Sequence, residues 1–147
     1  MAELRMERSI EVEATPEQIW EFMVDIGSWS EWKPFLISAA PVSGSPLTLG
    51  SKLKFKPRMG PLPITLKVEI IESNPPHRFA WTGGGPGLKA VHSFDFKDAG
   101  AGKTQVISWE EFKGIGVNLL KLFVSEEDLG ILHDDWVRAI KEKAEKK

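Results

Sequence analysis

The feature that most constrains this fold is a long run of strands and turns, residues 35–113, followed by one helix. The clearest strand in that run is LPITLKVEI, where apolar side chains occupy every second position of residues 62–70. Such alternation predicts a strand with one buried face. Short turns such as SNPPH and GGGPG separate the strands. Consecutive strands are therefore expected to pair antiparallel and to form a curved meander.

The end of the chain predicts a helix that covers this sheet. Leu129, Leu132, Trp136 and Ile140 recur at helical spacing and form one apolar stripe. Ser125, three residues before an aspartate, predicts the cap at which the helix begins. A curved sheet with an apolar concave face needs a covering layer, and this helix is the predicted element long enough to supply it.

The amino-terminal part predicts one strand and two short helices. Residues 4–14 alternate like a half-buried strand. Thr15 and Gln18 then have the spacing of a capping box, and Ser28 and Glu31 repeat that spacing before a second helix. The chain thus changes direction between the first strand and the long run of strands.

Length and composition limit the classes of function. The 147 residues suit a single domain, 1–147, and the net charge of -2 gives no reason to expect nucleic acid as a partner. No apolar run approaches the ~20 residues that cross a bilayer, which favours a cytoplasmic protein without an integral membrane segment. Cysteine is absent, and the three histidines are far apart in sequence. No metal and no cofactor are therefore expected.

Two motifs carry a resemblance to a known superfamily. They are IEVEATPEQIWEFMVDIGSWSEWKPF near the amino terminus and TQVISWEEFKG before the last helix. With them the chain resembles the START-like, or SRPBCC, superfamily, and within it the polyketide cyclase/dehydrase-like group. The resemblance implies an α+β helix-grip fold. In that fold a curved seven-stranded antiparallel sheet surrounds a long C-terminal helix, two short helices follow the first strand, and an apolar cavity lies between sheet and helix.

Strand parity selects the candidate site residues. In LKAVHSFDF, His92 falls on the apolar face that points inward, together with Phe94. In TQVISWEEF the parity is ambiguous, and the resemblance favours Glu110 inside and Trp109 outside. Arg8 shares the inward parity of the first strand. Because the strands that carry them are neighbours in a helix-grip sheet, Arg8, Glu110 and His92 are expected to lie near one another.

Three interpretations of this polar group are open at this point. It is a satisfied polar cluster, an anchor for a ligand carbonyl or carboxylate, or an acid–base pair in which Glu110 tunes His92. His92 and Glu110 are thus the catalytic candidates. Of the two tryptophans that follow the first helix, Trp32 is expected to pack inward and Trp29 to be more peripheral.

The predicted function is the noncovalent binding or carriage of a small, largely apolar molecule, such as a lipid, polyketide, isoprenoid or aromatic metabolite. One alternative is a cyclase, aromatase or dehydratase that uses His92 as acid or base; another is a co-chaperone-like interaction module. A monomer or homodimer is expected. The residues expected to contact the ligand are Arg8, Trp32, Leu66, Val68, Trp81, His92, Phe94, Glu110, Leu132 and Trp136.

Overall fold

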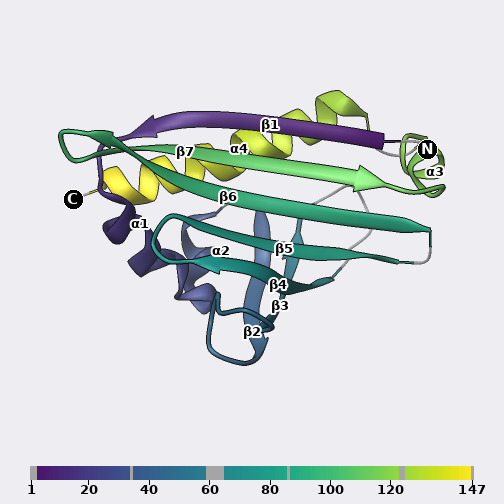
Figure 1. The fold of residues 1–147 in the computed structure, drawn as a ribbon, viewed down its shortest axis with the longest axis horizontal. Helices are drawn as coiled ribbons and strands as arrows, with labels where there is room; N and C mark the ends of the chain where they lie inside the picture. The colour runs from purple at the N-terminus through teal and green to yellow at the C-terminus, as the bar shows by residue number, and fades with distance from the viewer. Residues whose placement is uncertain (1–2, 34, 59–64, 86, 123–124, 147) are drawn as a thin grey trace.

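The computed structural model describes residues 3–33, 35–58, 65–85, 87–122 and 125–146. Strands dominate the middle of the chain and helices its two ends (Figure 1). The elements, in chain order, are β1 (Glu3–Val12), α1 (Pro16–Met23), the 3-10 helix η1 (Ile26–Ser28), α2 (Trp29–Trp32), β2 (Leu36–Ser43), β3 (Lys52–Pro57), β4 (Leu66–Asn74), β5 (Arg78–Gly85), β6 (Leu88–Gly100), β7 (Lys103–Lys113), α3 (Val117–Leu120) and α4 (Glu126–Glu145).

The strands form one seven-stranded sheet in the order β1-β7-β6-β5-β4-β3-β2, with every neighbouring pair antiparallel. Strands β2 to β7 are neighbours in chain order and form a meander, and β7 also pairs with β1. The predicted helix-grip architecture is confirmed. The residues of LPITLKVEI before Thr65 lie outside the described part of the chain, and β4 begins at Leu66.

Two of the three predicted helix caps are confirmed. Thr15 and Gln18 form a reciprocal capping box at α1, and Ser125 and Asp128 form one at α4. The cap predicted at Ser28 is wrong, because this residue already has helical backbone angles at the end of η1. Its hydroxyl donates instead to the backbone carbonyl of Asp25, at 2.8 Å.

The long helix α4 lies along β1 and β7, and its buried side contributes to the interior (Figure 1). Trp136, on this side, is 1% exposed and contacts rings from several strands and from α2. The helix therefore packs against the sheet through a bulky aromatic side chain. Rings that meet at the edge, as several of these do, gain stabilisation beyond the burial of their area.

Trp29, and not Trp32, enters the centre of this aromatic core. The Trp29 ring is fully buried, contacts Trp81 and Trp136, and donates its indole N–H to the carbonyl of Met23 at 3.0 Å. Trp32 is only partly buried, and its ring packs edge-on against Phe22. The expectation for the two rings is thus reversed, because α2 has a single turn and the preceding η1 sets the direction in which it enters the fold.

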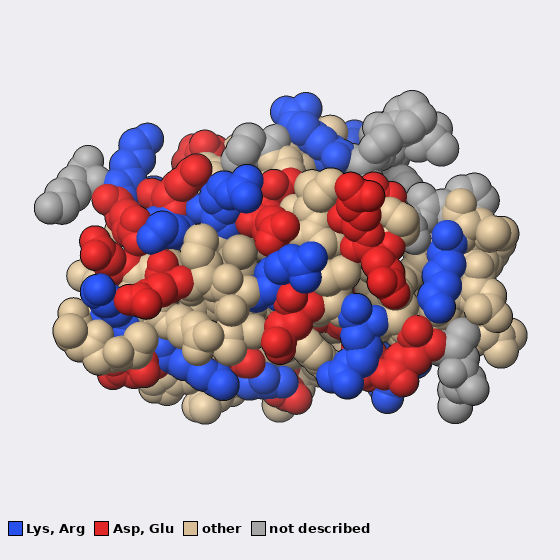
Figure 2. Space-filling model, turned by 90° about the horizontal axis from the view of Figure 1, so that it is seen from above, with Lys and Arg blue, Asp and Glu red and all other residues tan. Residues whose placement is uncertain are grey.

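The surface shown in Figure 2 carries acidic and basic side chains interspersed, without a broad area of one sign. Among the described helices none is long and apolar enough to span a membrane.

Candidate functional site

His92 and Glu110 lie directly opposite each other on β6 and β7. Both point to the concave side of the sheet, as do Ser108 on β7 and Phe94 on β6, which form the next inward pair along the ladder. The period of two in a strand brings these side chains to one face. The predicted proximity of His92 and Glu110 follows from this register. Trp109 lies on the other face, where Arg5 covers its ring at 5.2 Å.

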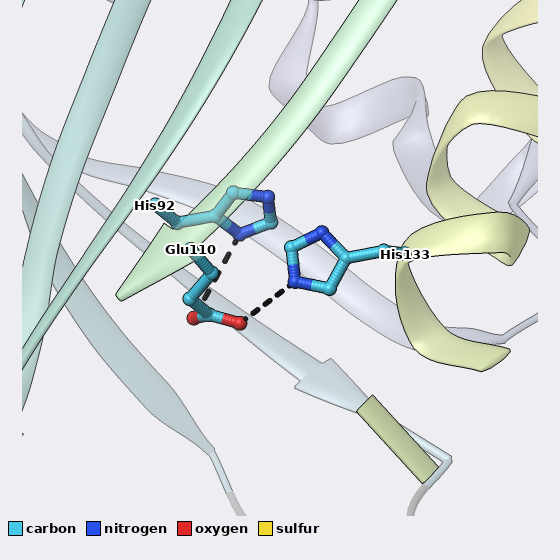
Figure 3. Close-up of side chains that lie close together, drawn as sticks. All are labelled: His92, Glu110 and His133. Atoms are coloured by element: carbon cyan, nitrogen blue, oxygen red, sulfur yellow. Dashed lines mark hydrogen bonds and ion pairs between the residues drawn. The ribbon is translucent and has the colours of Figure 1, made fainter. Parts of the chain in front are cut away.

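A second histidine, His133, reaches the same place from α4. It occupies the buried side of this helix, one turn before Trp136, and is itself fully buried. Figure 3 shows its imidazole facing that of His92, with the Glu110 carboxylate between the lower edges of the two rings. The ring centroids of the two histidines are 4.7 Å apart.

Four side chains form a continuous hydrogen-bonded chain. The Nε2 atom of His92 lies 2.7 Å from the Ser108 Oγ, and the same oxygen lies 2.8 Å from the His133 Nδ1. The His133 Nε2 lies 3.0 Å from the Glu110 Oε1. The second carboxylate oxygen is 3.9 Å from the His92 Nδ1, which is longer than a hydrogen bond.

The carboxylate fixes the direction of these bonds. A carboxylate can only accept, so the His133 Nε2 donates to Glu110, and the neutral form of this ring accepts at Nδ1. The Ser108 hydroxyl donates to that nitrogen and accepts from the His92 Nε2. The His92 Nδ1 is left with a lone pair and has no hydrogen bond to any described residue. The chain thus ends in a basic nitrogen.

Electrostatics keep His92 neutral at physiological pH. Burial is the main cause, and it lowers the pKa of His92 well below its ordinary value. A neutral imidazole with a free nitrogen accepts a hydrogen bond or a proton from a neighbouring group. If a proton is added at Nδ1, shifts along the two Ser108 bonds transfer the positive charge to His133, next to Glu110.

The same atoms bear on metal binding. His92, Glu110 and His133 each offer one ligand atom, and these atoms lie within 4.8 Å of one another. Two imidazoles and a carboxylate suit zinc, but bonds of about 2.0–2.1 Å in a tetrahedron place donor atoms only about 3.4 Å apart. The side chains therefore have to close around an ion, whereas the hydrogen-bonded chain fits their present spacing.

Ser108, His133 and Glu110 also have the composition of a serine hydrolase triad. The Ser108 oxygen is fully buried, however, and is engaged by both imidazoles. A nucleophilic serine needs an open approach for the carbonyl that it attacks. The geometry thus fits a proton path better than a nucleophile.

Arg8 does not join this cluster. Its guanidinium pairs with Asp134 of α4 at 3.3 Å, with both side chains 43% exposed, and lies against Gly130. The backbone of Arg8 lies directly opposite Ser108 in the β1–β7 register, as expected for a place beside the cluster, and only its guanidinium points away. β1 is the edge strand beside α4, so the long side chain extends sideways over the helix.

The remaining predicted contact residues divide into two groups. Those that surround His92 or lie in the same core are Val68, Trp81, Phe94 and Trp136, all at most 7% exposed. Leu66 is 39% exposed, and Leu132 and Trp32 are partly buried. Leu132 lies beside His133 on α4, so the helix presents the histidine rather than the leucine to the polar cluster.

Aromatic rings occupy the space beside His92. Its ring lies 4.3 Å from Phe94, 5.1 Å from Trp81 and 5.9 Å from Trp136 between centroids. A pocket that the described residues outline lies elsewhere, beside Arg5, Met6, Glu7 and Trp109. An open cavity beside His92 therefore stays a prediction, and a ligand placed there has to separate these rings.

Comparison with known proteins identifies the family. A family model described as polyketide cyclase / dehydrase and lipid transport matches residues 3–144. The chain belongs to this family. A search of curated proteins found no significant match.

Solved structures share the fold at low sequence identity. A START superfamily protein from Mycobacterium smegmatis is 13% identical, with 96% of this chain and 97% of that chain covered and a TM-score of 0.75. The Zhui aromatase/cyclase from Streptomyces sp. R1128 is 13% identical, with 98% of this chain and 94% of that chain covered and a TM-score of 0.75. Norcoclaurine synthase from Thalictrum flavum is 15% identical, with coverages of 99% and 88% and a TM-score of 0.74. At such identities the likeness establishes the fold alone.

Proposed function

We propose that this protein binds a small, largely apolar molecule and holds a hydroxyl or enol group of that molecule at the Nδ1 atom of His92. The observation that carries the proposal is the ordered chain from His92 through Ser108 and His133 to Glu110. It ends in a nitrogen that lacks a hydrogen bond within the described part of the chain, on a ring that lies against Phe94, Trp81 and Trp136.

The surroundings of His92 suit an apolar or aromatic ligand body. Phe94, Trp81 and Trp136 flank the imidazole. A ligand in contact with these rings gains about 25 cal/mol for each Å² of apolar area that leaves water. One polar contact then fixes its orientation, as in most small-molecule sites. The lipid transport members named in the description of the family agree with such a role.

A matched pair of probes tests the proposal. 2-Naphthol and 2-methylnaphthalene share an apolar body, and only the first donates a hydrogen bond. We expect the wild-type protein to bind naphthol about 3- to 10-fold more tightly, which is the value of one hydrogen bond. His92→Phe keeps a ring at this position and should remove the preference.

His77→Phe is the control, since this histidine is exposed and its ring Nδ1 lies 3.3 Å from the backbone carbonyl of Phe96. Absence of binding by both probes contradicts the proposal. So does a naphthol preference that survives in the His92→Phe variant.

The hydrogen-bonded chain also favours a second candidate function, acid–base catalysis of the cyclase or dehydratase type. His92 would take a proton from a substrate hydroxyl or from a carbon next to a carbonyl, and the charge would pass to His133 beside Glu110. General base catalysis by a positioned imidazole contributes about 10²- to 10⁴-fold. The cyclases and dehydrases in the description of the family agree with this candidate.

A further inference from the structure

A lysine lies in the aromatic core, where lysine is rarely found. Lys33 follows the last residue of α2 and is fully buried. Its ammonium nitrogen lies 3.7 Å from the ring centroid of Trp136, 3.8 Å from that of Trp29 and 4.5 Å from that of Trp32. The three indoles thus form a cage around the end of the side chain.

The cage leaves the amine without an acceptor. The Lys33 Nζ makes no hydrogen bond to any of the residues that the structure describes. Indole faces attract a cation, but they do not replace the acceptors that three N–H groups need. Burial accordingly lowers the pKa of Lys33 well below its ordinary value. A fully buried and unpaired lysine is costly, and an anionic oxygen that reaches it offsets part of this cost.

Lys33 and His92 face the same interior. Both contact Trp136. The Lys33 Nζ lies 3.7 Å from the Trp136 ring centroid, and the His92 and Trp136 ring centroids are 5.9 Å apart. Charge on Lys33 also lowers the pKa of His92, so the two groups are electrostatically connected. A molecule that lies against the Trp136 ring is therefore positioned to reach both polar groups.

We propose that Lys33 is a second anchor of the interior site and binds the carboxylate of a small apolar acid. The three indoles would contact the apolar body of this acid. The inference rests on the proposed function and narrows its ligand class to aromatic or aliphatic acids. A carboxylate supplies the acceptors that the cage lacks, and the resulting ion pair is shielded from water. Charge-assisted hydrogen bonds of this kind are about twice as strong as neutral ones.

The probes are 2-naphthoic acid and 2-naphthamide, which match in shape and differ in charge. We expect the wild-type protein to bind the acid at least about 10-fold more tightly than the amide, as a charge-assisted bond provides. Lys33→Met keeps the length of an unbranched apolar chain and removes the amine. In this variant we expect affinities for acid and amide that agree within about twofold.

Lys121→Met is the matched control, because Lys121 also follows the last residue of a one-turn helix, α3, and is exposed. It should retain the preference for the acid. Equal affinities of the wild-type protein for acid and amide overturn the inference, whether or not Lys33→Met folds. So does a preference that persists in Lys33→Met.

The two proposals fail differently. If 2-naphthol binds and the acid is not preferred over the amide, the Lys33 anchor is wrong and the apolar site remains. If neither naphthol nor naphthoic acid binds, the proposed function fails as well.

Discussion

Substitution of Lys33 by methionine should stabilise the protein in the absence of ligand. The amine is fully buried and has no hydrogen bond among the described residues, so the folded state carries either an unpaired charge or a deprotonated lysine. Leaving a buried charge without a partner costs about 3–5 kcal/mol. The three indole faces attract the charged form, but they supply none of the acceptors that its three N–H groups need, so part of that cost remains.

We therefore expect Lys33→Met to raise the free energy of unfolding by about 1–3 kcal/mol at pH 7. For a chain of this size the gain corresponds to a rise in Tm of about 3–10 °C. The methionine thioether fits against the same rings, so the substitution opens no large cavity. Urea and thermal unfolding of the wild type, Lys33→Met and Lys121→Met measure the effect, and the exposed Lys121 control should leave stability unchanged.

The difference in stability should also depend on pH. Because the pKa of Lys33 is lower in the folded state than the ordinary value of about 10.4, the unfolded chain binds more protons between the two pKa values. Wild-type stability contributed by this group therefore rises with pH across that window. The advantage of Lys33→Met should shrink as the pH approaches about 10. A variant that is less stable than the wild type by about 1 kcal/mol or more would refute the reasoning.

Three further predictions concern the hydrogen-bonded chain. Acid should destabilise the protein through His92. The pKa of His92 is lowered in the folded state, so the unfolded chain takes up the proton first as pH falls below about 6.5. Unfolding curves of His92→Phe at acid pH should lack this loss of stability. Ser108→Ala removes the hydroxyl that both imidazoles contact, and it should cost about 1–3 kcal/mol in urea unfolding while Ser38→Ala, on an exposed part of β2, costs little. His92→Ala separates carrier from enzyme: a carrier loses about 0.5–1.5 kcal/mol of ligand affinity, whereas an enzyme keeps its affinity and loses about 10²-fold or more in turnover of a cyclisation or dehydration substrate.

The sequence predicts the fold and one half of the polar cluster, because strand alternation is a local property. Parity alone places His92 on the inward face, and the pairing of neighbouring strands adds Glu110 opposite to it. The caps at Thr15 and Ser125 likewise depend on residues only three positions apart. These features need no knowledge of how distant elements pack.

The rest of the site depends on the rotation of helices, which local patterns leave open. Leu132 and His133 are adjacent on α4, and a small rotation of the helix decides which of them meets Ser108. The heptad-like spacing of His133 with Leu129, Trp136 and Ile140 is the signal that identifies it. An apolar stripe drawn through Leu132 overlooks this histidine.

Lys33 illustrates a different limit. A lysine next to a proline at the end of a short helix normally predicts an exposed cation, and nothing in the pattern WSEWK indicates burial. Its position follows from the entry of Trp29 into the core, which places the residue one turn later among the indoles. Tertiary packing, and not propensity, determines this placement.

The most direct test of the account is a titration of the ¹⁵N-histidine-labelled protein with 2-naphthol, followed by NMR. The chain has three histidines, so each ring nitrogen is assignable with the His77→Phe and His92→Phe variants. In the free protein we expect His92 to carry its proton on Nε2 and a lone pair on Nδ1, as the direction of the bonds through Ser108 requires. Addition of naphthol should shift the Nδ1 resonance of His92 and leave His77 unchanged. A His92 ring protonated on Nδ1 in the free protein, or one whose resonances do not respond to naphthol, would contradict the account.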